Sequence, residues 1–246
     1  METLLAFLAA LISLRLAGDL ATRYRNRAPG RAAPELLAWA AALAAYALAS
    51  AALAWGAAAG WDDRAFRVYY LFGGLLTAPL LGVGSLLLSG RRWATPLGLV
   101  YAGLAAGVAV AAPIVEPVVG SSIPEAQDHL DFVPARLVAV LGNTLGTAAV
   151  VVVALATLRR RPLANILILA GVAVAAAGSA VAGLGEAESA IFVAVAAVLL
   201  YAGFLAAVGA RPVLAELLPG SRPSSTAREP DVGITSPKPT AGEPEA

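Results

Sequence analysis

Residues 34–59 read PELLAWAAALAAYALASAALAWGAAA, and this stretch decides the class of fold. After Glu35 it holds no charged residue through residue 59. A helix rises about 1.5 Å per residue, so a run of this length crosses the roughly 30 Å hydrocarbon layer of a membrane. Pro34 and Glu35 suit a first helical turn, because proline needs no N–H partner there and an acid favours the positive end of the helix dipole. The stretch therefore predicts a membrane-spanning helix over 35–59.

Six more apolar stretches share this pattern along the 246 residues. Hydrophobic residues make up 59% of the chain and charged residues 13%, whereas soluble domains average about 45–50% and about 25%. Most of these stretches also lack the polar face that a soluble helical bundle needs. The predicted fold is an all-α polytopic membrane protein, a seven-transmembrane-helix bundle over residues 1–211. Its helices are predicted at 4–24, 35–59, 64–88, 95–113, 134–158, 162–184 and 189–210.

Residues 212–246 have a different composition, rich in Pro, Ser, Thr, Gly and Glu towards the end. Such a segment cannot bury enough apolar surface to fold by itself. We predict a short interfacial segment followed by a disordered cytoplasmic tail.

The arginines predict the orientation, because Lys and Arg accumulate in cytoplasmic loops. The turns after the first, third and fifth predicted helices hold nine arginines, and the opposite turns and helix edges hold three. This alternation predicts an N-terminus outside and a C-terminus in the cytoplasm. A single lysine, Lys238, stands against 16 arginines. Together with the many Ala, Gly and Val residues this bias is typical of a GC-rich bacterial genome, so we expect a multi-pass protein of the inner (plasma) membrane.

The first three and last three predicted helices share a plan. Each trio has a basic turn after its first helix and an alanine-rich second helix, which predicts a 3+1+3 parallel repeat with the fourth helix as connector. The alternative is that helices rich in Ala, Leu and Val resemble each other by composition. This layout resembles the SWEET and PQ-loop sugar transporters, and parallel-repeat transporters bind substrate near the midplane. The chain lacks the Pro-Gln dipeptide of those families, and its only glutamine, Gln127, lies in a predicted loop.

The stretch RVYYLFGGLLTAPLL over residues 67–81 resembles the third helix of microbial rhodopsins. Those proteins hold retinal as a Schiff base on a lysine of their seventh helix. No predicted helix here contains a lysine. A retinal Schiff base is therefore excluded, and no other cofactor is expected.

Uncharged polar side chains within the predicted helices indicate a pocket near the membrane midplane, because each needs a hydrogen-bond partner in hydrocarbon. Asn143 is the most costly of them to bury without one. The alternative is hydrogen bonding between helices, worth about 0.6 kcal/mol on average in measured cases. The candidate ligand-binding residues are Tyr46, Thr77, Asn143, Thr144, Thr147, Ser179 and Tyr201.

Four charged residues are further candidates. Arg15 and Asp19 are four residues apart on one helical face and predict an intramembrane ion pair; the alternative is that Arg15 extends towards the interface. Arg67 and Arg136, near the outer ends of the third and fifth helices, predict a basic mouth for an anionic ligand, or else interfacial anchors.

No catalytic or metal-binding motif occurs, there is no cysteine, and the single histidine, His129, lies in a predicted loop. We therefore expect no enzyme and no metal site. The leading prediction is binding or transport of a small solute or lipophile. The alternative is a non-enzymatic sensory or scaffolding module that acts through a partner. Expected partners are the lipid bilayer, a small-molecule ligand and either a second copy or another membrane protein, whereas a net charge of +1 indicates no nucleic acid.

Overall fold

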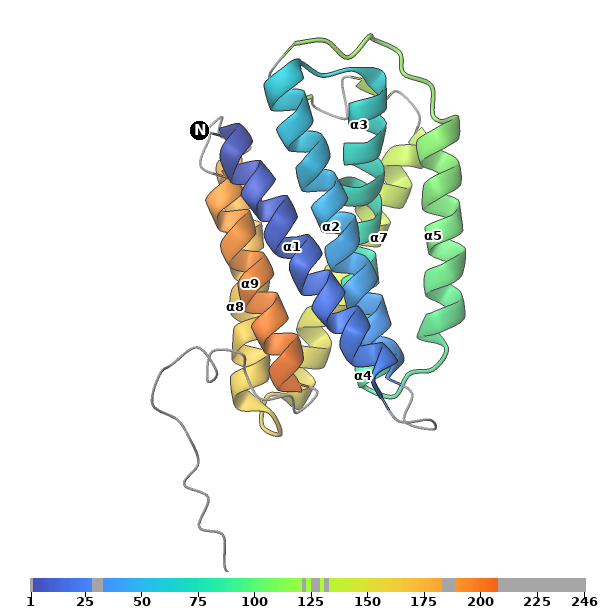
Figure 1. The fold of residues 1–246 in the computed structure, drawn as a ribbon. Coiled ribbons are helices and arrows are strands. Elements are labelled where there is room, and N and C mark those ends of the chain that lie inside the picture. The colour runs from blue at the N-terminus through green and yellow to red at the C-terminus, as the bar shows by residue number, and fades with distance from the viewer. Residues whose placement is uncertain are drawn as a thin grey trace, which may run out of the picture. The chain divides into compact units, whose positions relative to one another are not determined.

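A computed structural model describes residues 2–27, 33–120, 123–124, 129–130, 133–182 and 189–207. These residues form helices joined by turns, with no strand among them (Figure 1). The predicted all-α class is therefore confirmed for this part of the chain. The elements are α1 (Glu2–Arg25), α2 (Pro34–Ala59), α3 (Asp63–Tyr69), η1 (Tyr70–Leu76), α4 (Thr77–Leu88), α5 (Ala94–Ala111), α7 (Val133–Thr157), α8 (Pro162–Ala182) and α9 (Ser189–Ala207).

Five of the helical segments are long and apolar enough to cross a membrane, which suggests a membrane protein. Segments α3, η1 and α4 follow each other without a break and count as one, Asp63–Leu88. Two shorter apolar helices, Pro162–Ala177 and Val195–Ala207, lie within α8 and α9. Where both ends of a helix are described, they differ from the predicted ends by at most two residues. The predicted tail over 212–246 lies outside the described residues.

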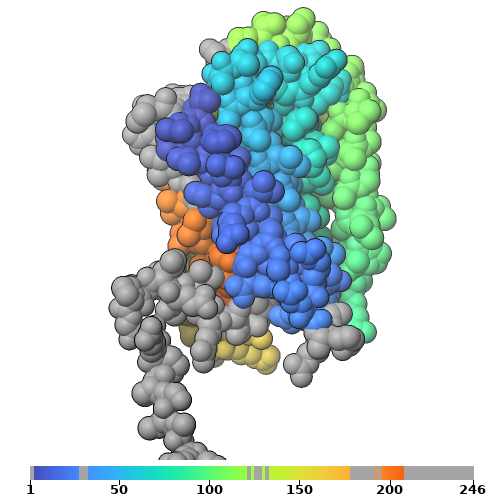
Figure 2. Space-filling view, viewed as in Figure 1, coloured from blue at the N-terminus to red at the C-terminus, as the bar shows by residue number. Residues whose placement is uncertain are grey.

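Small residues line the tightest helix contacts. Helix α1 packs on α2, α8 packs on α9, and α4 packs on both α2 and α7. The buried face of α1 carries Ala6, Ala9, Ser13 and Ala17, spaced by three or four residues. Small side chains let helix backbones approach closely, which is how helices associate in lipid. Seen in space-filling view, α1 lies across α2 on one face of the bundle and α5 forms an edge (Figure 2).

Large apolar side chains cover the outside of the bundle. Leu99, Val100, Val110 and Val152 are all at least 63% exposed. A soluble protein of this size would not expose so many contiguous apolar side chains. The outer surface therefore suits hydrocarbon.

The third long helix is interrupted by a π-helical segment. Proline has no N–H and clashes with the carbonyl four residues earlier, so Pro79 predicts a disruption and a free carbonyl at Leu75. The structure has the π-helix η1 over Tyr70–Leu76, directly before that proline. The Leu75 carbonyl accepts a hydrogen bond from the Tyr101 hydroxyl of α5 at 2.9 Å. A neighbouring helix thus satisfies the carbonyl that the proline leaves free.

Helices α4 and α7 cross almost backbone to backbone. A Cβ atom added at Gly146 would lie 2.5 Å from the Ala78 carbonyl oxygen, and one added at Gly82 would lie 2.7 Å from the Gly146 Cα. Only glycine fits at either position. This crossing places α7 beside η1, and it brings the polar residues of both segments together.

Candidate functional site

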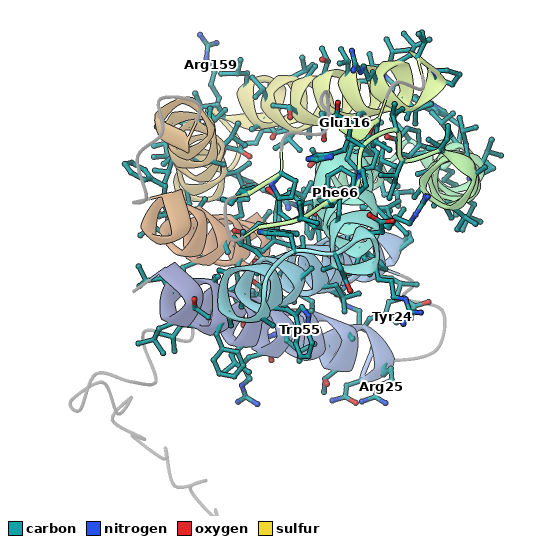
Figure 3. The ribbon with its side chains drawn as sticks, turned by 90° about the horizontal axis from the view of Figure 1, so that it is seen from above. Tyr24, Arg25, Trp55, Phe66, Glu116 and Arg159 are labelled. Carbon is teal, nitrogen blue, oxygen red and sulfur yellow. The ribbon has the colours of Figure 1, made fainter. Side chains whose placement is uncertain are left out.

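A cavity of about 460 Å³ lies among α2, η1, α4, α7, α8 and α9. Every residue that lines it falls within six residues of the middle of its long helical segment. Viewed along the bundle, α8 and α9 lie on one side of the space between the helices and α7 closes another (Figure 3). The cavity is thus at mid-height, where a helix that crosses a membrane passes the bilayer centre.

Four of the seven predicted pocket residues line this cavity: Tyr46, Thr77, Asn143 and Thr147. The remaining lining is apolar and mostly small, with several alanines of α8 and α9. Thr144, one residue from Asn143, is exposed and does not line the cavity. Ser179 belongs to α8, but its side chain lies outside the described residues.

Two of the lining residues also hydrogen-bond to the π-helical segment. The Asn143 amide donates to the Gly74 carbonyl at 2.7 Å, and the Thr77 hydroxyl donates to the Phe72 carbonyl at 2.7 Å. A π-helix shifts the backbone pairing, so carbonyls around it need other donors. The Asn143 bond is the interhelical hydrogen bond that sequence analysis held as the alternative, whereas the Thr77 bond stays within its own helical segment. The Asn143 side chain also has an amide oxygen, which can accept further hydrogen bonds.

The Tyr46 hydroxyl is buried and makes no hydrogen bond of good geometry among the described residues, although the Ser50 side chain lies near it. Ser50, one turn further along α2, is the polar side chain that faces it. A buried hydroxyl without a partner costs about 1–3 kcal/mol. A residue that lines the cavity therefore carries a buried hydroxyl that makes no hydrogen bond of good geometry within the described part of the chain.

Tyr201 does not belong to the cavity, which corrects the prediction made for it. Its hydroxyl donates to the Asp19 carboxylate and joins α9 to the C-terminal half of α1. The predicted Arg15–Asp19 pair is also wrong, because Asp19 pairs with Arg23 at 2.7 Å and Arg15 is exposed. An acid four residues before a base, as in Asp19–Arg23, suits the helix dipole better than the reverse order in Arg15–Asp19.

The two predicted outer-mouth arginines hydrogen-bond to backbone carbonyls. The Arg67 guanidinium donates to the Ala109 carbonyl at 2.6 Å and to the Val110 carbonyl at 3.2 Å, at the end of α5. A cation there satisfies free carbonyls and complements the negative end of the helix dipole. Arg136 donates to the Leu130 carbonyl at 3.1 Å. Neither contact reaches the cavity.

Sequence analysis missed Tyr101 and the aromatic pair Trp39–Phe204. Tyr101 satisfies the Leu75 carbonyl, and a tyrosine in the middle of an apolar helix is itself a signal that a partner is needed. The rings of Trp39 and Phe204 stack with centroids 4.1 Å apart and join α2 to α9. Nothing in the sequence pairs these two residues, which are distant along the chain.

Comparisons of the chain with protein-family models, with curated proteins and with solved structures gave no match. The function that follows is therefore inferred from the cavity and the residues around it.

Proposed function

We propose that the chain crosses the membrane seven times and binds a small, largely apolar molecule in the cavity at mid-height. The molecule carries at least one hydroxyl group, which accepts a hydrogen bond from the Tyr46 hydroxyl and donates one to the Asn143 side-chain oxygen or to the Thr147 hydroxyl. The observation that carries this proposal is a cavity of about 460 Å³ lined by Tyr46, whose buried hydroxyl makes no hydrogen bond of good geometry among the described residues.

Seven crossings are supported by the five long apolar segments and by the apolar character of α8 and α9. The arginines support an N-terminus outside and a C-terminus in the cytoplasm of the plasma membrane. In this arrangement two basic turns lie on the cytoplasmic side of the membrane. One joins α4 to α5 and carries Arg91 and Arg92, and the other joins α7 to α8 and carries Arg159, Arg160 and Arg161.

The cavity has the size and polarity of a small-molecule site. Such sites measure about 300–1,000 Å³ and are lined mainly by apolar side chains with a few polar groups that fix orientation. Here Tyr46, Asn143 and Thr147 supply the polar groups from two different helices. An apolar molecule with one polar group would satisfy the Tyr46 hydroxyl and fill the rest of the space.

The position favours transport over simple storage. Transporters hold substrate near the midplane between helical units that move against each other. Helices α8 and α9 pack tightly on each other, and the cavity lies between this pair and helices α2, α4 and α7. Movement of the α8–α9 pair would therefore open the cavity.

Native mass spectrometry of the protein released from its own membranes tests the proposal. We expect a co-purified small molecule on the wild-type protein. Ala176→Phe adds a ring at a residue that lines the cavity and should remove the molecule. Ala177→Phe, at the next position of α8 and outside the lining, is the matched control and should retain it. Equal occupancy of both variants would refute a ligand in this cavity.

Tyr46→Phe tests the polar contact. It removes only the unsatisfied hydroxyl, so it should leave the unfolding midpoint unchanged or higher and lower the occupancy by about tenfold, the equivalent of one hydrogen bond of about 1.4 kcal/mol. Tyr24→Phe, which removes a hydroxyl near the end of α1 (Figure 3), is the control. If Tyr46→Phe kept the occupancy of the wild-type protein, the Tyr46 hydroxyl would not contribute to binding.

A further inference from the structure

A second hollow lies on the outside of the bundle, between α4, α5 and α7, with a volume of about 300 Å³. Its floor is formed by the glycines and Pro79 of the α4–α7 crossing, and its rims by leucines such as Leu97, Leu104 and Leu141. These three leucines are 50–54% exposed. We call this hollow the α4–α5–α7 groove.

The groove offers no hydrogen bond to an occupant. Tyr101 is its one lining residue with a side-chain polar atom, and that hydroxyl lies 2.9 Å from the Leu75 carbonyl oxygen and 3.2 Å from the Val138 carbonyl oxygen. Its single proton is therefore engaged within the protein. The occupant of the groove must be a hydrocarbon.

The groove runs along the helices towards the turn between α4 and α5. On α4 it extends from Pro79 to Leu86, and on α5 from Leu104 back to Leu97. Seven helical residues cover about 10 Å, which is roughly two-thirds of the hydrocarbon depth of one membrane leaflet, about 15 Å. One acyl chain of a lipid matches this length.

Two arginines lie at the end of the groove. Gly90 adopts a φ of 86° in the tight turn between α4 and α5, and Arg91 and Arg92 follow it directly. Both arginines are exposed, and no ion pair involves them among the described residues. Trp93, which is 53% exposed, comes next and suits the membrane interface.

We propose that the α4–α5–α7 groove and the Arg91–Arg92 turn together bind one anionic phospholipid. An acyl chain lies in the groove, and the phosphate of the headgroup pairs with the two guanidinium groups, which match phosphate in geometry and charge. The proposal requires only that the chain lies in a membrane and does not depend on the cavity at mid-height.

Competition between two lipids with the same acyl chains tests this site. The purified full chain is mixed with equal amounts of phosphatidylglycerol and phosphatidylcholine, and bound lipids are counted by native mass spectrometry. Arginines near an anionic headgroup contribute about 1 kcal/mol each. We therefore expect the wild-type protein to prefer phosphatidylglycerol by about tenfold or more, and the Arg91→Gln/Arg92→Gln double variant to lose the preference.

A second double variant controls for general basic attraction. Arg159→Gln/Arg160→Gln removes the same charge at the turn after α7, where Arg159 points away from the bundle on the side of α7 away from α5 (Figure 3). It should keep the preference. If the first double variant keeps the preference, or if both lose it equally, the headgroup site is refuted.

The acyl chain is tested separately. Leu141→Trp at the rim of the groove should lower binding of both lipids by the same factor and leave their ratio unchanged. Leu141 is 50% exposed, so the variant should keep the unfolding midpoint of the wild-type protein. If Leu141→Trp bound both lipids as well as the wild-type protein does, the acyl chain could not lie in the groove, and this part of the proposal would be refuted.

Discussion

The side-chain amide of Asn143 in α7 donates a hydrogen bond of 2.7 Å to the backbone carbonyl of Gly74 in η1. This bond joins α7, which crosses α4 almost backbone to backbone, to a π-helical segment whose backbone departs from α-helical pairing. The same residue lines the central cavity. Asn143 therefore both joins two helical segments and lines the proposed binding site, so substitutions there should affect stability and the proposed binding together.

Asn143→Ala is expected to lower the free energy of unfolding by about 1 kcal/mol, because the Gly74 carbonyl loses its donor inside an apolar bundle. Thr144→Ala, at the next, exposed position, should change it little. Both values can be measured by titration with a denaturing detergent. Equal stability of the two variants would show that the Asn143–Gly74 bond contributes nothing measurable.

Gly146→Ala should destabilise the bundle by about 1–3 kcal/mol, the usual range for overpacking. The added Cβ would lie 2.5 Å from the Ala78 carbonyl oxygen and 2.7 Å from the Pro79 nitrogen, and backbone atoms cannot rotate away. Gly103→Ala is the matched control in another helix, since a Cβ there meets no atom within 4 Å. That control should be neutral or stabilising, because alanine is the better helix former. Similar unfolding midpoints for the two variants would contradict the close crossing of α4 and α7.

Asp19→Asn should cost on the order of 1 kcal/mol of stability, because it weakens the ion pair with Arg23 within α1 and the hydrogen bond from Tyr201 that joins α9 to α1. Arg15→Gln removes a charge one turn away that makes no such pair among the described residues. Its midpoint in the same detergent titration should equal that of the wild-type protein. A larger loss for Arg15→Gln than for Asp19→Asn would restore the pairing first expected from the sequence.

The proposed orientation can be tested with single cysteines, because the chain has none of its own. Val119 lies before α7 and is 78% exposed, and Ser89 lies in the turn after α4. Each is replaced by cysteine in a separate variant. A membrane-impermeant maleimide should label Val119→Cys in intact cells and Ser89→Cys only after lysis. Labelling of both in intact cells, or of Ser89→Cys alone, is incompatible with the arrangement of seven crossings.

Helix positions could be predicted from the sequence because each depends on local composition. Apolar runs between charged turns define the segments, and residues that suit a first helical turn, such as Pro34, define where they begin. The disruption near Pro79 was predicted for the same reason, since a missing N–H acts within one or two turns. Its form, a π-helix over Tyr70–Leu76, depends on donors from α5 and α7 and could not be read locally.

The cavity was only partly predictable. Polar residues at mid-helix identified Tyr46, Thr77, Asn143 and Thr147, because hydrocarbon leaves such groups few alternatives. Tyr201 satisfied the same criterion, yet it lies beside Asp19. The contacts between helices depend on packing between segments that are far apart in the chain. Local patterns in a single sequence do not show which of these segments are in contact.

The central claim is that the cavity at mid-height holds a small molecule hydrogen-bonded to Tyr46. An experimental density map of the protein, extracted with its surrounding membrane lipids, measures this most directly. We predict density within the cavity among α2, α4, α7, α8 and α9, with a polar group within hydrogen-bonding distance of the Tyr46 hydroxyl. A cavity closed by the protein's own side chains, with the Tyr46 hydroxyl bonded to one of them, would contradict the proposal.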